Sequence, residues 1–174
     1  MGTNHMGRQS IRFPQPPVVR GFASVAGKKE REGPLGDQFT ATVQDTTFGE
    51  KSWERAERRM QQMTLELALE KAGLTDADLD AAFAGDLLNQ CIGSSFSLRN
   101  RGVPTLGLYG ACSTMAESLL LAAMSVSGGY ARTALAMTSS HFASSERQYR
   151  FPLGYGGQRT PTSQWTVTGA GAVL

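Results

Sequence analysis

The stretch from Ser113 to Ser127 carries one charged residue, Glu117, and its apolar side chains cover most of the circumference of a helix. A helix that is apolar all round is buried on all sides rather than lying on a surface. We therefore expect this helix between two layers of a larger fold, with its first residues directed into a pocket. The apolar segment 105–109 precedes it, and Cys112 lies at the junction of the two.

Apolar segments alternate with helical patterns along most of the chain. From Ser52 the apolar positions recur at helical spacing as far as Gly73, a typical stop, and Thr75 is placed to cap a short second helix. Further elements are expected as follows: strands over 18–23, 81–85, 105–109, 133–139 and 165–174, a helix over 94–100, and loops over 26–36 and 140–164. This alternation predicts an α/β fold with a mostly parallel five-stranded sheet and a buried central helix after Cys112.

Composition excludes several classes of protein. A net charge of +2 from scattered basic and acidic residues indicates no nucleic-acid partner. Two cysteines without a CxxC motif argue against a zinc site or a disulfide framework. The longest apolar run, 119–124, is far shorter than the ~20 residues of a membrane span. Residues 1–7 resemble a vector-derived tag, which leaves 8–174 as a single domain.

Three polar clusters follow three of the expected strands. They are Asp86, Asn89 and Gln90; Cys112, Ser113 and Thr114; and Ser139, Ser140 and His141. Loops after parallel strands emerge at the same carboxyl edge of a sheet. Because the strands 105–109 and 133–139 belong to consecutive units, we expect them to be neighbours, which would place Cys112 and His141 on one patch.

The chemistry of Cys112 stays open at this point. The positive end of a helix dipole lowers the pKa of a thiol or holds an anion, so the junction is suited to a nucleophile or to a ligand pocket. A lone cysteine at such a junction is also commonly a small buried hydrophobe. Cys91 lacks this context, and we interpret it as inert. His141, the one histidine of interest, gains significance only from its position.

Several motifs resemble a known family. "GACST" (110–114) and "TGAGAVL" (168–174) are similar to the nucleophile motif and the glycine-rich strand of thiolases and ketoacyl synthases. The match narrows further with "KEREGPLG", "KSWERAER", "AGDLLNQ", "GACSTMAE" and "TSSHFASSERQYRFPLGYGGQ", in this order. Together they resemble the stage V sporulation protein AD family, and the likeness spans nearly all of the chain from about residue 20.

The resemblance implies a thiolase-like half-domain that binds dipicolinic acid (pyridine-2,6-dicarboxylate) for uptake into developing spores. It implies a soluble subunit of a membrane-associated complex, located in the cytoplasm or forespore and peripheral to the spore inner membrane, with the other subunits as partners. Condensing enzymes of this fold take their catalytic histidines from a second half, which this chain lacks, so none is carried over and enzymatic activity is not expected.

Dipicolinate is a planar dianion, which calls for cationic forks, N–H donors and a flat wall. The expected ligand set comprises Asp86, Asn89, Gln90, Cys112, Ser113, Thr114, Ser140, His141, Arg147, Arg150, Tyr155 and Arg159. No metal site or cofactor is expected, although calcium could accompany the ligand, with Asp86 near it. The alternative for the arginines is that their loop only folds over the sheet and pairs with nearby acids.

Two other functions compete with ligand binding. Cys112 could form a thioester in a thiolase-like or ketoacyl-synthase-like acyl transfer, or the half-fold could be an interaction module with a vestigial pocket. The helix 113–127 would expose an apolar side that a second half normally covers, so we expect a homodimer through that face, unless the chain is a fragment.

Overall fold

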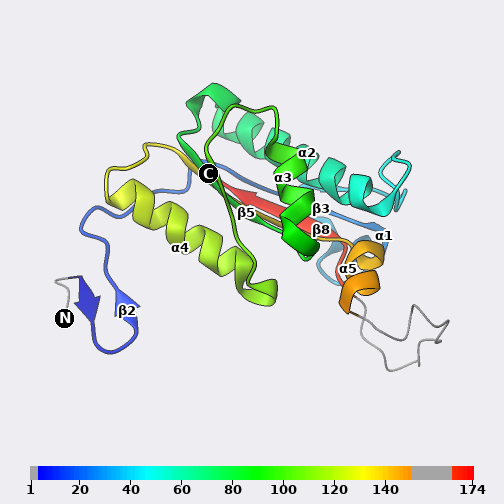
Figure 1. Ribbon diagram of the computed structural model, residues 1–174, viewed down its shortest axis with the longest axis horizontal. Coiled ribbons are helices and arrows are strands. Elements are labelled where there is room, and N and C mark those ends of the chain that lie inside the picture. Colours follow the sequence, from blue (N-terminus) through cyan, green and yellow to red (C-terminus); the bar gives the residue numbers. More distant parts are fainter. Residues whose placement is uncertain (1–3, 150–165) are drawn as a thin grey trace.

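A six-stranded mixed sheet forms the centre of the fold, and helices pack on both of its faces (Figure 1). The computed structural model describes residues 4–149 and 166–174. The strands are β1 (His5–Met6), β2 (Ser10–Ile11), β3 (Phe22–Ala26), β4 (Ala41–Thr42), β5 (Ala81–Gly85), β6 (Thr105–Gly107), β7 (Ala134–Ser140) and β8 (Gly169–Val173). The helices are α1 (Lys28–Arg31), α2 (Trp53–Ala72), α3 (Ile92–Leu98), α4 (Thr114–Ser127) and α5 (Phe142–Tyr149).

The strand order is β4-β3-β8-β7-β5-β6, while β1 and β2 form a separate hairpin. The α/β class is confirmed, but the sheet has six strands rather than five. It is also mixed, because β8 runs antiparallel to both β3 and β7. The alternation of strands and helices predicts parallel pairing only where a helix carries the chain across, and it says nothing about the direction of the last strand.

The order of the strands overturns one expectation about the site. β5 lies between β6 and β7 and is parallel to both, so the strands that precede Cys112 and His141 are not neighbours. Consecutive βαβ units are usually adjacent, but a strand earlier in the chain can occupy the position between them. The three loop clusters still leave the same edge, with the turn after β5 in the middle.

α2 is the element that the sequence predicts best. The hydroxyl of Ser52 accepts a hydrogen bond from the Arg55 backbone nitrogen (3.3 Å), and Gly73 ends the helix in the left-handed conformation at φ 65°. Buried residues of α2 pack with β3, β7 and β8 in the main core. Thr75 makes the predicted capping box with Asp78, although the helix it caps is only a 3₁₀ turn, Asp76–Asp78.

Other boundaries differ from the predicted ones. The first long strand is β3, Phe22–Ala26, instead of 18–23, and Val18 and Val19 are exposed. The predicted loop 140–164 begins with α5, and the predicted loop 26–36 contains the short α1. These helices have only four and eight residues, so they leave little periodic signal in the sequence.

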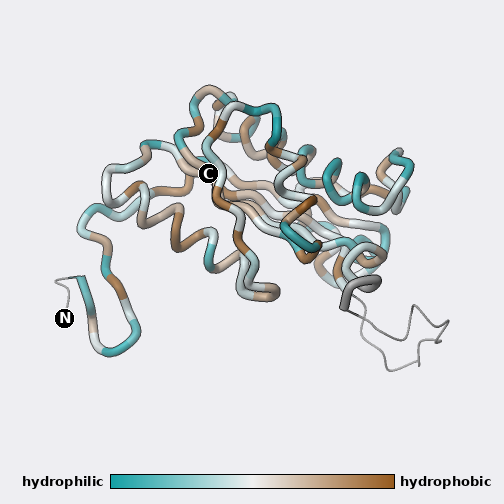
Figure 2. Tube along the Cα trace, in the orientation of Figure 1, coloured by the Kyte–Doolittle hydropathy of each residue, from teal (hydrophilic) through white to brown (hydrophobic). Residues whose placement is uncertain are grey.

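α4 covers the face of the sheet opposite α2 and α3, and its burial differs from the expectation (Figure 1). Its buried side chains are small: Thr114, Ser118 and Ala122, each one turn apart. Leu120 and Met124 are each 45% exposed, so within this chain the helix is not buried on all sides. Apolar stretches recur along the whole of α4 (Figure 2).

Within the described part of the chain, no helix combines the length and hydropathy of a membrane span.

The end of β5 tolerates only glycine, because the chain there is tightly packed. A Cβ atom at Gly85 would overlap the carbonyl oxygen of Leu108 and the methyl group of Thr114. Without a side chain at this position, the backbone of β5 lies close to both the end of β6 and the first turn of α4. The absence of a side chain at Gly85 is therefore a condition for the arrangement of the loops described below.

We predict that Gly85→Ala lowers the free energy of unfolding by about 2 kcal/mol, because the added methyl group forces the start of α4 away from β5. Gly171→Ala is the matched control, since a Cβ on Gly171 in β8 meets no heavy atom of the described residues within 4 Å. It should change stability by less than about 0.5 kcal/mol. Urea denaturation followed by circular dichroism measures both, and equal midpoints for the two variants would contradict the packing at Gly85.

Candidate functional site

A cavity of about 300 Å³ lies at the carboxyl ends of β5 and β7, beside the first turn of α4. Its lining residues are Gly85, Asp86, Leu87, Ala111, Cys112, Thr114, Met115, Thr138, Ser139, Ser140, Thr166 and Gly169. All three predicted loop clusters contribute to it, although not with all of their members. The candidate residues that the structure brings together here are Asp86, Cys112, Thr114, Ser139 and Ser140.

A sharp turn places Cys112 at the rim of this cavity. Ala111 has φ 50°, a left-handed conformation that is uncommon for a residue with a side chain. The hydroxyl of Thr114 holds the turn, because it accepts from the Gly110 nitrogen (3.1 Å) and donates to the Ala111 carbonyl oxygen (2.9 Å). The thiol of Cys112 is consequently exposed and lies at the positive end of the α4 dipole.

Ser140 supplies the cavity with an uncommitted hydroxyl. Its Oγ atom is buried and has no hydrogen-bond partner among the described residues. An unpaired buried hydroxyl costs free energy, and a ligand that accepts its hydrogen bond recovers that cost. Ser140 is therefore the wall residue that is best prepared for a polar ligand.

The neighbouring Ser139 is committed to a buried carboxylate behind the wall. Its hydroxyl donates to Glu57 Oε1 (2.7 Å), and the Ser144 hydroxyl of α5 donates to Glu57 Oε2 (2.5 Å). Glu57 is fully buried on α2, and burial raises its pKa from 4.5 to about 7. The two serine hydrogen bonds oppose this increase, and the nearby Asp86 adds to it.

Gln61 extends the network across the domain. Its amide nitrogen donates both to Ser139 Oγ (2.7 Å) and to Ser94 Oγ (3.1 Å), and Ser94 Oγ donates to Asp86 Oδ2 (2.6 Å). The Gln61 carbonyl oxygen accepts from the Ser97 hydroxyl (2.6 Å). Glu57 and Asp86 are thus the two ends of one continuous chain of hydrogen bonds.

Asp86 has a structural task in addition to its place at the cavity. Oδ1 accepts from the Leu88 backbone nitrogen (2.9 Å), and Oδ2 accepts from the Ser94 backbone nitrogen (2.7 Å). Its carboxylate therefore holds the turn after β5 and the first turn of α3. The ion pairs of the described residues do not include Asp86. Within residues 4–149 and 166–174, no three His, Cys, Asp or Glu side chains gather as a metal cluster.

His141 lies behind the site and does not line the cavity. It is fully buried, its Nε2 is 2.8 Å from the Thr46 carbonyl oxygen, and its ring stacks on Phe142 with centroids 5.0 Å apart. The Ala143 backbone nitrogen donates to Nδ1 (3.2 Å), so the ring is the neutral tautomer with its proton on Nε2. Burial lowers the pKa of His141, which favours that neutral form. The predicted shared patch with Cys112 is therefore wrong.

The remaining predicted residues are distributed as follows. Asn89 and Gln90 are exposed on a 3₁₀ turn, Asn89–Cys91, and do not line the cavity. Ser113 is exposed and donates to the Gly110 carbonyl oxygen (2.8 Å). Arg147 belongs to α5, but its side chain lies outside the described part of the chain, as do the residues Arg150, Tyr155 and Arg159.

Cys91 fits its interpretation as a structural cysteine. It is buried, its thiol donates to the Leu108 carbonyl oxygen (3.3 Å), and burial raises its pKa. A raised pKa keeps the sulfur protonated at neutral pH, so it is a poor nucleophile.

Sequence reasoning missed Glu57 and Gln61, although a signal for them exists. They lie four residues apart, directly beside Ala56 and Met60, which belong to the predicted apolar stripe. Polar residues next to an apolar stripe, at the same spacing, can face the core when serines on other elements provide partners. Those serines, Ser94 and Ser139, are remote from α2 in the sequence, so no local pattern predicts the contact.

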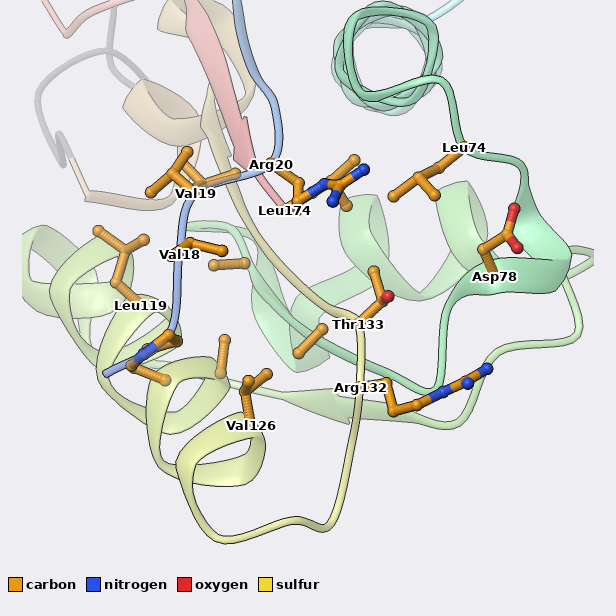
Figure 3. A pocket seen from close by; sticks show the side chains of 16 residues that line it. Val18, Val19, Arg20, Leu74, Asp78, Leu119, Val126, Arg132, Thr133 and Leu174 are labelled. Atoms are coloured by element: carbon orange, nitrogen blue, oxygen red, sulfur yellow. The ribbon is translucent and has the colours of Figure 1, made fainter. Parts of the chain in front are cut away.

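A larger cavity, of about 500 Å³, lies away from this edge of the sheet (Figure 3). The segment 17–20, α4, the start of β7 and Leu174 surround it. Its charged lining residues are Arg20, Asp78 and Arg132, and it contains none of the candidate site residues. Size alone would therefore select a cavity that none of the predicted site residues lines.

Comparisons with known proteins agree with the fold and add a family. The family model described as Stage V sporulation protein AD matches residues 7–174. Stage V sporulation protein AD from Bacillus subtilis (strain 168) is 45% identical over 168 residues, which are 97% of this chain and 50% of that protein. The chain thus spans about half the length of this curated relative.

This chain also matches only about half the length of the solved structures that share its fold. The 3-oxoacyl-[acyl-carrier-protein] synthase III from Aquifex aeolicus VF5 matches 89% of this chain with 52% of its own, at a TM-score of 0.57 and 18% identity. OleA from Xanthomonas campestris matches 91% with 57% of its own, at a TM-score of 0.59 and 16% identity. At this identity the likeness shows the fold alone, which is that of about half a thiolase-like subunit.

We predict that Glu57 makes stability depend on pH. The unfolded chain ionises Glu57 near pH 4.5 and the folded chain only near pH 7, so its stabilising effect is complete below pH 4.5 and is lost as the pH rises through about 7. This pKa difference corresponds to about 3 kcal/mol. Urea unfolding measures this at pH 5 and pH 8. Between these two pH values, the free energy of unfolding of Glu57→Gln relative to the wild type should increase by about 2 to 3 kcal/mol.

Glu70→Gln is the matched control for that measurement, because Glu70 is exposed on the same helix. It should leave the pH dependence unchanged. A stability difference between wild type and Glu57→Gln that stays constant from pH 5 to pH 8 would show that Glu57 is ordinary in its ionisation.

Proposed function

The chain belongs to the stage V sporulation protein AD family, and from that premise we propose that it binds dipicolinic acid for uptake into the developing spore. In this proposal it is a non-enzymatic binding subunit, and its partners are the other subunits of a complex at the spore inner membrane. Its place is on the cytoplasmic or forespore side of that membrane, in peripheral association with the complex.

The observation that carries this proposal is the cavity beside the first turn of α4. It combines the buried, unpartnered hydroxyl of Ser140 with the positive end of a helix of fourteen residues. A carboxylate accepts hydrogen bonds and is stabilised by a helix N-terminus, so these two features favour an anionic ligand together. A cavity of about 300 Å³ has room for a single flat aromatic ring with two carboxylates.

Individual roles follow from position. Ser140 donates to one carboxylate, and Cys112 and Thr114 flank the ligand at the helix terminus. We assign the cationic and aromatic contacts to Arg147, Arg150, Tyr155 and Arg159, whose side chains lie outside the described residues. Asn89, Gln90, Ser113 and His141 do not line the cavity and are not included. Calcium, if it accompanies the ligand, is chelated by dipicolinate, and titrations with and without calcium measure its contribution.

One observation favours a second candidate function, acyl transfer through a thioester on Cys112. The left-handed Ala111 exposes this thiol on a strand-to-helix turn, as in a nucleophile elbow. However, no histidine lines the cavity in the described part of the chain, so the imidazole that activates a thiol in a Cys–His pair is not found there. Incubation with acyl-CoA, followed by mass spectrometry, separates the two functions, because only acyl transfer leaves an adduct on Cys112.

We predict that Ser140→Ala weakens dipicolinate binding about tenfold, because a hydrogen bond to a charged group contributes about 1.5 kcal/mol or more. Calorimetric titration of the purified chain measures this. Ser127→Ala, at the other end of α4, is the matched control and should bind as the wild type does. If Ser140→Ala keeps full affinity, or if the wild type gives no heat with dipicolinate, this cavity is not the binding site.

The outer face of α4 leads to a second prediction, that two copies of the chain associate through it. Leu119, Leu120 and Met124 are 39–45% exposed on that face, and such a patch favours self-association. Sedimentation velocity should therefore show a dimer for the wild type and a monomer for Leu120→Lys. Leu35→Lys changes a leucine that is 65% exposed between α1 and β4, and it should remain dimeric. A monomeric wild type would rule the dimer out.

A further inference from the structure

One carboxylate lines the cavity and a second lies behind it, and the ion pairs of the described residues include neither of them. Asp86 lines the cavity, and Glu57 lies one hydrogen bond behind it, at Ser139. We propose that Glu57 is a proton-linked switch: an anionic ligand enters the cavity together with a proton that binds Glu57, and this turns the Ser139 hydroxyl toward the ligand. The inference rests on the proposed function, because it takes the ligand to be a dicarboxylate.

The direction of the hydrogen bonds makes such a switch possible. With Glu57 ionised, Ser139 accepts from Gln61 and uses its only proton on Glu57 Oε1 (2.7 Å). The cavity wall then offers a lone pair at Ser139, which repels a ligand carboxylate. When Glu57 is protonated, its own O–H donates to Ser139 Oγ, because the oxygen still has an acceptor site. The Ser139 proton is then free to point into the cavity, where it can donate to an anion.

Gln61 keeps this change local. Its amide nitrogen donates to Ser139 and to Ser94, and its carbonyl oxygen is held by Ser97, so the amide cannot turn over without losing bonds. Ser94 likewise remains committed to Asp86. Only the hydroxyl hydrogen of Ser139 and the proton on Glu57 need to move, and no heavy atom has to be displaced.

The charges around Glu57 favour proton uptake. Asp86, at the end of β5, and Glu54, one turn earlier on α2, both raise the pKa of Glu57. Arg58 makes an ion pair with Glu50 (3.3 Å), and His141, between β7 and α5, is neutral with a lowered pKa. Because burial already brings the pKa of Glu57 to about 7, a dianion in the cavity raises it further, and the complex takes up a proton at neutral pH.

Calorimetric titration with dipicolinate tests the switch. Above about pH 6 both ligand carboxylates are ionised, so any pH dependence comes from the protein. We expect the wild-type affinity to fall about tenfold from pH 7.5 to pH 8.5, because each bound ligand then requires one proton. Titrations at pH 7.5 in phosphate and in Tris, which differ in ionisation enthalpy, should show uptake of about one proton per ligand.

Three variants separate a switch from a merely structural role. Glu57→Gln keeps a donor for Ser139 without ionising, so it should bind at pH 8.5 as tightly as the wild type does near pH 6, with no proton uptake. Ser139→Ala removes the donor and should bind weakly at every pH, also without proton uptake. Glu70→Gln, on the exposed face of α2, should reproduce the wild-type pH profile.

The outcomes distinguish the two proposals. Binding with the same affinity from pH 6.5 to pH 8.5, or without proton uptake, overturns the switch and leaves dipicolinate binding intact. A wild-type pH profile in Glu57→Gln also overturns it, because another group would then carry the proton. If the chain binds no dipicolinate at any pH in this range, the proposed function fails, and the switch fails with it.

Discussion

The two hydrogens of one amide nitrogen hold together the edge of the sheet on which the site is built. Gln61 on α2 donates to Ser139 at the end of β7 and to Ser94 on α3. The hydroxyl of each serine in turn donates a hydrogen bond to a buried carboxylate. Four elements are joined in this way without an intervening cation. Buried polar groups are expensive unless every donor and acceptor is used, so this network allows little freedom in how α2 and α3 sit over the strands.

Two backbone features, at Gly85 and at Ala111, form the other side of the cavity at this edge of the sheet. Gly85 allows β5 to approach the end of β6 and the first turn of α4, and Ala111 takes a left-handed conformation that brings Cys112 to the rim. The polar network fixes one wall, and the turn before α4 fixes the other. In the described walls of this cavity, the groups that can still adjust are therefore hydroxyl hydrogens, because packing and hydrogen bonds hold the rest.

The two sides of α4 differ in the size of their side chains. The side of α4 that touches the sheet consists of Thr114, Ser118 and Ala122, whereas larger apolar residues such as Leu120 and Met124 point away from it. Small residues allow a helix to lie close to a sheet, and large ones need another partner on the far side. In the solved structures that share this fold, the part that this chain matches is 52–57% of the whole.

The amino-acid sequence by itself determined the α/β class, the limits of α2 and the capping box at Thr75, because these depend on local periodicity. It also determined that polar residues gather after β5, β6 and β7, because the loops after parallel strands share one edge of the sheet. Only the tertiary structure decided that β5 separates β6 from β7 and that β8 runs antiparallel, since strand order depends on which surfaces pack best. It also decided that His141 lies in an aromatic cluster and that Glu57 and Gln61 lie behind the cavity. Their partners are remote in sequence, and no local pattern records a contact between residues that meet only in the folded chain.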